Sequence, residues 1–282
     1  MAKPVEGPPK GAQARPTGSE GPAGPAGPKR PERPGGWGQV LTLARYEFAS
    51  FWGGATGALA LLVFLGLEGL FFNNSVAAYA LANLGAMSRG GAIDATLTMF
   101  TVGLSDLGLL LALVSPLATM RSFASSAHGG HLDLLMSWPL GRRRLTLSLF
   151  CAAFFSVSLL AVLGLTPYAL LLSMGVGSLR LLAAAFLGLI LAVAAFVAVG
   201  LAVSSHTRKP MASALTTLGA LGFMWAIGWA GPYIPETASL LVQGLAFGPR
   251  INHFTLGLLD FNDVLYFAAL TLCSLALAKP VR

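Results

Sequence analysis

Six long apolar stretches constrain this chain more than any other feature of its sequence. As helices of roughly 20 residues or more, they would each cover the hydrocarbon core of a bilayer, which is about 30 Å thick. We place them at 55–72, 99–120, 147–174, 179–203, 211–231 and 261–279. Of the 282 residues, 55% are hydrophobic and only 10% are charged, which is too few charges for the surface of a soluble enzyme. The sequence therefore predicts an all-α integral membrane protein, with a six-span domain over residues 55–279.

The six stretches are not equally regular. The first is short for a span, and the last is strongly apolar only from Val264, so it needs tilt or local thinning of the bilayer. The third is long and contains Pro167, which lacks a backbone N–H and clashes with the preceding turn. We therefore predict that the third span either kinks or continues past the membrane.

Two segments precede the first span. Residues 1–36 are rich in Pro, Gly and Ala and contain no Leu, Ile, Phe or Trp, so they predict a disordered basic tail. Residues 37–54 predict an amphipathic helix that ends at Gly53 and Gly54 and lies in the cytoplasmic membrane interface. Its apolar positions recur at spacings of three and four: Trp37, Val40, Leu41, Ala44, Phe48, Phe51 and Trp52. The alternative is a helix packed on a soluble domain, and the chain offers no such domain.

Lys and Arg are distributed asymmetrically over the predicted loops. With the N-terminus in the cytoplasm, 15 of the 18 basic residues lie inside, and only Arg89, Arg180 and Arg250 lie outside. Cytoplasmic loops of membrane proteins are enriched in these residues, so we expect both termini in the cytoplasm. The formal net charge of +7 is then a topology signal, and we do not expect nucleic acid as a partner.

The predicted cytoplasmic loop between the second and third spans has a helical apolar pattern. Apolar side chains recur from Phe123 to Trp138, Pro139 ends the pattern, and Arg142–Arg144 follow. Such a helix suits the docking of a peripheral partner. It equally suits a loop helix that lies on the membrane and is anchored by arginines.

Two blocks of sequence resemble a known family. The first is Ser115-Pro-Leu-Ala-Thr-Met-Arg-Ser-Phe-Ala124, followed by Gly130-His-Leu-Asp-Leu-Leu135 and Pro139-Leu140. It resembles the permease subunits of ABC-2 type transporters, and among them the gliding-motility-associated and nitrous-oxide-cluster permeases. The second block resembles the segment entering the last span of that family, through His253, Phe254, Gly257, Asp260, Asp263 and Tyr266.

The first block departs from the family pattern at a few positions. Ser125 and Ser126 stand where the family has an acidic pair, His131 where it has Thr, and Asp133 where it has Glu. Because carboxylates of the family pattern are missing here, any contact with a partner that depends on them is in doubt. The position of the loop is not.

The resemblance implies the permease subunit of an ATP-driven exporter in the bacterial inner membrane. Residues 121–139 would be the coupling loop, touching a separate ATPase through Phe123, Asp133, Leu134, Leu135 and Trp138. The other implied partners are a second permease subunit, giving a homo- or heterodimer, and an auxiliary subunit with a periplasmic domain. The chain has no Gly-Lys-Ser or Gly-Lys-Thr of a P-loop, so we do not expect it to bind or hydrolyse ATP. We therefore expect that it is not an enzyme and that it binds no cofactor.

Few polar residues remain as candidates for other chemistry. Glu68 and Asp106 fall within predicted spans, where ionisable residues are costly and often functional. We expect both near the outer ends of their spans, in reach of interfacial water, rather than on a transport pathway. Asp260 and Asp263 would share a helix face, with Asp260 as a candidate N-cap. No metal site is expected, because the histidine pair His128 and His131 lacks a third ligand nearby.

Two other function classes remain open. A standalone channel or secondary transporter would place charges or broken helices at the midplane, where this chain has almost none. An integral membrane enzyme that modifies lipid would need a cluster of catalytic His, Asp or Glu residues at the cytoplasmic face, and the sequence supplies only Asp133 beside two histidines.

Overall fold

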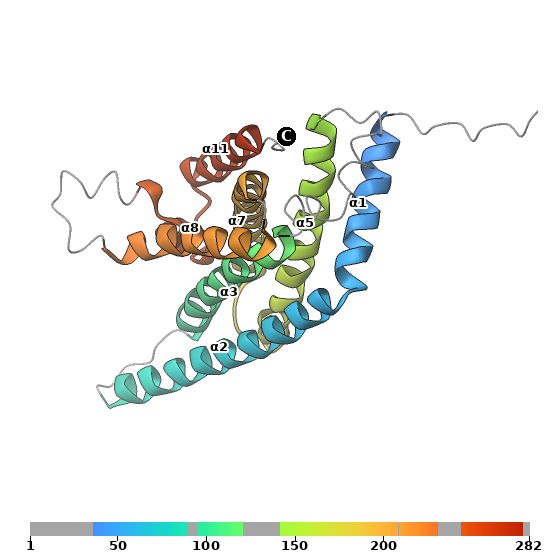
Figure 1. Cartoon of the computed structure of the whole chain (residues 1–282). Helices are drawn as coiled ribbons and strands as arrows, with labels where there is room; N and C mark the ends of the chain where they lie inside the picture. The colour runs from blue at the N-terminus through green and yellow to red at the C-terminus, as the bar shows by residue number, and fades with distance from the viewer. Residues whose placement is uncertain (1–35, 89–94, 121–141, 208, 231–243, 279–282) are drawn as a thin grey trace, which may run out of the picture. The chain divides into compact units, whose positions relative to one another are not determined.

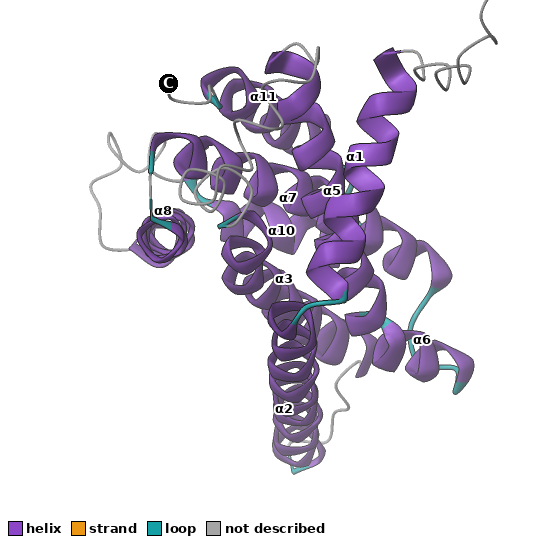
Figure 2. Cartoon of the chain, turned by 45° about the vertical axis from the view of Figure 1, so that its right-hand side comes forward, coloured by secondary structure: helices purple, strands orange, loops and turns teal. Residues whose placement is uncertain are grey.

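The computed structural model describes residues 36–88, 95–120, 142–207, 209–230 and 244–278, and everything below refers to these residues. Their regular structure is helical, without a strand (Figure 2). In chain order the helices are α1 (Gly36–Trp52), α2 (Ala55–Met87), α3 (Ala95–Thr119), α5 (Arg142–Gly164), α6 (Thr166–Ser173), α7 (Leu179–His206), α8 (Pro210–Ala230), α10 (Phe247–Thr255) and α11 (Phe261–Leu277).

Among the described residues, five helical segments are long and apolar enough to cross a membrane. They are α2, α3, the segment formed by α5 and α6, α7 and α8. Helix α11 is apolar but has only 17 residues, so it falls below that length. These lengths and compositions are those of an all-α, multi-pass membrane protein.

Helix α2 extends beyond the predicted first span. The prediction ended this span at residue 72, but the helix continues to Met87 and has 33 residues. Its length of about 50 Å exceeds a bilayer core of about 30 Å, so it must tilt or project beyond it. The low hydropathy of Asn73 and Asn74 marked the end of an apolar stretch. Neither residue breaks a helix, and the following alanines and leucines favour one.

The helix of the third predicted span is interrupted next to Pro167, as the first of the two alternatives predicts. Helix α5 ends at Gly164, α6 begins at Thr166, and Pro167 occupies its first turn. The chain stays nearly helical across the break, because the N–H of Leu165 donates to Ala161 O and the N–H of Ala169 donates to Leu165 O. The proline therefore interrupts the helix, while backbone hydrogen bonds continue on both sides of the break.

Helix α7 is the centre of the bundle. It packs against α3, α5, α8, α10 and α11, which surround it in Figures 1 and 2. The close approach depends on small residues, as is common between membrane helices. Gly188 faces Phe254 of α10, and Gly200 faces Thr119 of α3, with no room for a side chain at either glycine.

Helix α1 packs along α5 through one side only (Figure 1). Val40, Leu43 and Ala44 are buried on that side. Trp37 and Leu41, which the sequence placed on the same apolar side, are 75% and 63% exposed. The apolar surface of α1 is therefore divided between the bundle and an outward face.

The tight contact at Gly188 leads to a prediction about stability. A Cβ at Gly188 would lie 2.5 Å from the Cβ of Phe254, so Gly188→Ala would force the backbone of α10 away from α7. We expect this variant to lose about 1–3 kcal/mol in the free energy of unfolding. At Gly222 on α8 a Cβ meets no atom within 4 Å, so Gly222→Ala should be neutral or stabilising by up to about 1 kcal/mol. Thermal unfolding of both variants in detergent would test this, and equal midpoints would contradict it.

Candidate functional site

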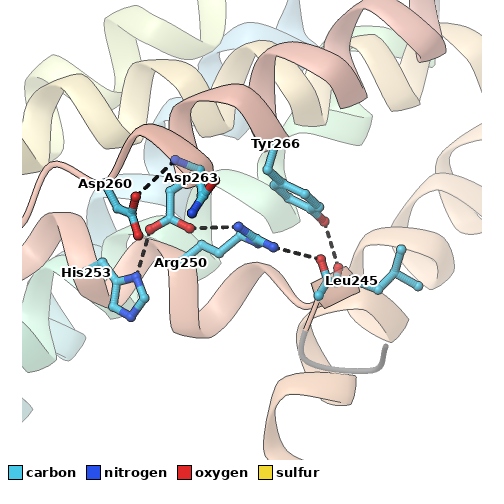
Figure 3. Close-up of polar contacts among 8 residues, drawn as sticks. Leu245, Arg250, His253, Asp260, Asp263 and Tyr266 are labelled. Carbon is cyan, nitrogen blue, oxygen red and sulfur yellow. Dashed lines mark hydrogen bonds and ion pairs between the residues drawn. The ribbon is translucent and has the colours of Figure 1, made fainter. Parts of the chain in front are cut away.

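Helix α10 is a short amphipathic helix that leads into α11. Phe247, Ile251 and Phe254, at spacings of four and three, are buried against α3, α7 and α8. Arg250 and His253 alternate with these positions and face α11 (Figure 3). The apolar side fixes α10 on the bundle, so its polar side chains are held in place for contacts with α11.

A tight turn connects α10 to α11. Gly257 has φ of 77°, a left-handed conformation that favours glycine after a helix C-terminus, and its N–H donates to Phe254 O. The N–H of Leu258 donates to His253 O. Asp260 then caps α11 by accepting from the N–H of Asn262 at 3.0 Å, which confirms its predicted role as an N-cap.

Asp263 is the centre of a polar network between the two helices (Figure 3). Its side chain is buried, and its two oxygens have different partners. Arg250 Nη1 donates to Oδ1 at 2.7 Å, and His253 Nδ1 lies 2.7 Å from Oδ2. The partner of Oδ1, Arg250, is largely buried. The partner of Oδ2, His253, is about half exposed.

The network extends from Asp263 to the segment before α10. Arg250 Nη2 donates to Gly244 O at 3.0 Å, and the hydroxyl of Tyr266 donates to Leu245 O at 2.7 Å. The guanidinium carbon of Arg250 lies 4.1 Å from the centre of the Tyr266 ring, in cation–π geometry. We call Leu245, Arg250, His253, Asp263 and Tyr266 the α10–α11 network. Apart from Arg250 Nε, which has no hydrogen-bond partner, its groups bond to one another and to the backbone, so its evident chemical role is to lock α10 to α11.

A second polar cluster lies between α2, α3 and α6. Glu68 is 3% exposed, and both of its carboxyl oxygens lack a hydrogen-bond partner. Phe72, one turn beyond Glu68 on α2, packs on the Tyr168 ring, and Gly103, one turn before Asp106 on α3, lies against the Tyr168 hydroxyl. The Tyr168 hydroxyl is also buried, and no well-formed hydrogen bond joins it to Glu68. We call Glu68, Asp106 and Tyr168 the acidic cluster.

The acidic cluster overturns one expectation. Glu68 was expected near interfacial water, but it is buried 13 residues into a 33-residue helix. Asp106 is half buried, in the middle part of α3. This burial contradicts the expected contact of Glu68 with water. The expectation had ended the apolar stretch at residue 72, near Glu68, whereas the helix continues for about another four turns.

The structure brings together part of the predicted site. His253, Asp263 and Tyr266 meet in the α10–α11 network, Phe254 packs on Gly188, and Gly257 and Asp260 form the turn and the cap. The coupling-loop residues lie outside the described residues: Phe123, Asp133, Leu134, Leu135 and Trp138.

Two residues of these sites were missed by the sequence analysis. Arg250 was counted only as one of three basic residues outside the membrane, although it is an unusual charge between apolar segments. Tyr168 carried no signal beyond its place next to Pro167. In both cases the function of the residue depends on a partner from another helix, which local patterns do not reveal.

The chain was compared with known families and with characterised proteins. No family model matches it, and no curated protein sequence matches it.

Proposed function

We propose that this chain is the permease subunit of an ABC-2 type transporter, working as an exporter. In this proposal six helices cross the membrane: α2, α3, the α5–α6 segment, α7, α8 and α11. The order of elements supports it, since an amphipathic helix, α1, precedes the first apolar helix and a short amphipathic helix, α10, precedes the last. ATP binding and hydrolysis are assigned to a separate subunit, and a second permease subunit completes the pathway.

The observation that carries the proposal is the place of the family-like residues in the fold. His253, Asp263 and Tyr266 were chosen from the sequence for their resemblance alone, and they belong to one polar network. These residues lie on consecutive helices, so their contacts make the second block one structural unit, the α10–α11 pair. The proposal takes this unit as the segment that enters the last span.

Helix α1 has a specific place in this proposal. Trp37 and Leu41 are exposed on one flank of the helix, and Tyr46 is exposed on the other flank. Tryptophan and tyrosine favour the membrane–water interface, so we assign this exposed surface to the lipid headgroups on the cytoplasmic side. The opposite face, with Val40 and Leu43, holds α1 on α5.

One observation favours a second candidate, a secondary transporter. Such proteins use buried carboxylates within the membrane to bind coupling ions, and Glu68 is a buried carboxylate without a partner. The two proposals differ in their energy source. A secondary transporter works without an ATPase, whereas the permease proposal requires one.

The orientation can be tested by labelling introduced cysteines in intact cells. In a background with Cys151→Ala and Cys273→Ala, a membrane-impermeant maleimide should label Ser88→Cys, which is exposed at the end of α2. It should label Lys209→Cys, exposed before α8, only after the cells are permeabilised. This pattern follows from the excess of Lys and Arg on the cytoplasmic side. The reverse pattern would contradict the proposed orientation.

A further inference from the structure

The acidic cluster is the least satisfied polar site among the described residues. Both oxygens of Glu68 and the hydroxyl of Tyr168 are buried without a hydrogen-bond partner, and they come from different helices, α2 and α6. Neither Glu68 nor Asp106 forms an ion pair with a basic side chain within the part of the chain that the structure describes. The cluster thus combines two acidic side chains with buried oxygen atoms, those of Glu68 and Tyr168, that have no hydrogen-bond partner.

Other buried polar groups in the bundle show how unusual this is. Ser75, Ser148 and Ser156 each donate to a carbonyl of their own helix. A carboxylate cannot do so, because it only accepts hydrogen bonds. The buried carboxylate of Asp263 is instead paired with Arg250 and His253. Glu68 has no such basic group, although an unpaired carboxylate in an apolar medium is far more costly than an unpaired hydroxyl.

Aromatic rings hold the phenol of the acidic cluster in place. Phe72 and Phe100 meet the Tyr168 ring edge-on, with centroids 5.6 and 5.7 Å away. Gly103 leaves room for the Tyr168 hydroxyl, since a Cβ there would lie 2.2 Å from the hydroxyl oxygen. The phenol oxygen is therefore positioned by packing, and its place beside Glu68 is fixed by the fold.

We propose that Glu68, Asp106 and Tyr168 bind a small dehydrated cation. Two carboxylates and a phenol provide oxygen ligands, which suit an alkali-metal ion and also the three N–H donors of a primary ammonium group. The shared chemistry is one positive charge on a group small enough for a buried site. Because the ligands come from α2, α3 and α6, the bound cation would tie these three helices together.

The inference goes beyond the proposed function and does not depend on it. The binding belongs to this chain alone, so it can be measured on the purified full-length protein without an ATPase. A failure of cation binding would leave the permease proposal intact, and the absence of an ATPase partner would leave the cation site intact.

The test is cation-dependent thermal stability of the protein in lipid nanodiscs. Sodium chloride and methylammonium chloride are each titrated against N-methylglucamine chloride at constant ionic strength, since the bulk of N-methylglucamine excludes it from a buried site. A cation that binds only the folded state raises Tm in a saturable way. We expect this rise with at least one of the two cations. A rise with sodium alone identifies an inorganic ion as the ligand, and a rise with methylammonium alone identifies an ammonium group.

Three variants assign the effect to the acidic cluster. Glu68→Gln keeps the shape of the side chain but removes its charge, so it should abolish the rise without lowering Tm in N-methylglucamine. Asp106→Asn should raise the half-saturating concentration by about tenfold or more, because one charge-assisted contact is lost. Asp260→Asn, at an exposed carboxylate outside the cluster, should leave the titration unchanged. A wild-type Tm that is equal in all three salts, or a rise that persists in Glu68→Gln, would overturn the proposal.

Discussion

Replacing Asp263 by alanine is expected to lower the free energy of unfolding by about 3 kcal/mol, because it leaves a largely buried Arg250 without its counter-ion. The whole α10–α11 network depends on this carboxylate, which holds Arg250 on one oxygen and His253 on the other. His253 is half exposed and can turn to water, so we assign most of the loss to Arg250. The expected loss is therefore at the lower end of the range for breaking a buried pair.

The matched control for this change is Asp260→Ala. Asp260 is three residues away and exposed, and its known contact is the N-cap of α11, so its loss should cost about 1 kcal/mol. Thermal unfolding in detergent compares the two variants, and hydrogen exchange at the amides of α10 locates the effect. Equal destabilisation by Asp263→Ala and Asp260→Ala would mean that the network does not lock α10 to α11.

Leu134→Asp is expected to separate the chain from its ATPase. In the permease proposal Phe123, Leu134 and Leu135 are the apolar anchors of the coupling loop, and Asp133 is a polar contact at its rim. An anchor is commonly worth about 2 kcal/mol or more, which corresponds to roughly 30-fold in affinity, and a buried unpaired carboxylate adds to the loss. Asp133→Asn should weaken the contact only slightly, because an exposed rim charge contributes less.

This second prediction is measured by co-purification of the ATPase and by its rate in reconstituted membranes. Leu134→Asp should reduce both, while the thermal unfolding midpoint of the chain stays near that of the wild type. Asp133→Asn provides the control for a change of charge in the same loop. If Leu134→Asp retained the partner and its rate while remaining folded, residues 121–139 would not be the coupling element.

The sequence was most informative where the decisive physics is local. Hydropathy located the apolar helices, because a segment of about 20 apolar residues has few alternatives to a membrane helix. Pro167 marked the break between α5 and α6, since the missing N–H and the ring clash act within one turn. Asp260 was found as a cap because capping involves neighbours in sequence.

The errors came from features that are not local. The apolar stretch ended at residue 72, but the helix of α2 continues, because hydropathy reports the solvent preference of a segment and Asn73 and Asn74 remain compatible with a helix. The burial of Glu68 was missed for the same reason, and its neighbour Tyr168 comes from another helix, α6. Likewise Arg250 and Asp263 are 13 residues apart, and only the turn at Gly257 brings them into contact.

The central claim, that this chain works as the permease of an ATP-driven transporter, is tested most directly by isolating it from its own membranes under mild detergent. The proposal predicts that a second polypeptide with a P-loop co-purifies in a fixed ratio. The purified chain alone should hydrolyse no ATP, since it has no P-loop. A chain that purifies without an ATPase and still moves a solute across reconstituted membranes would contradict the claim.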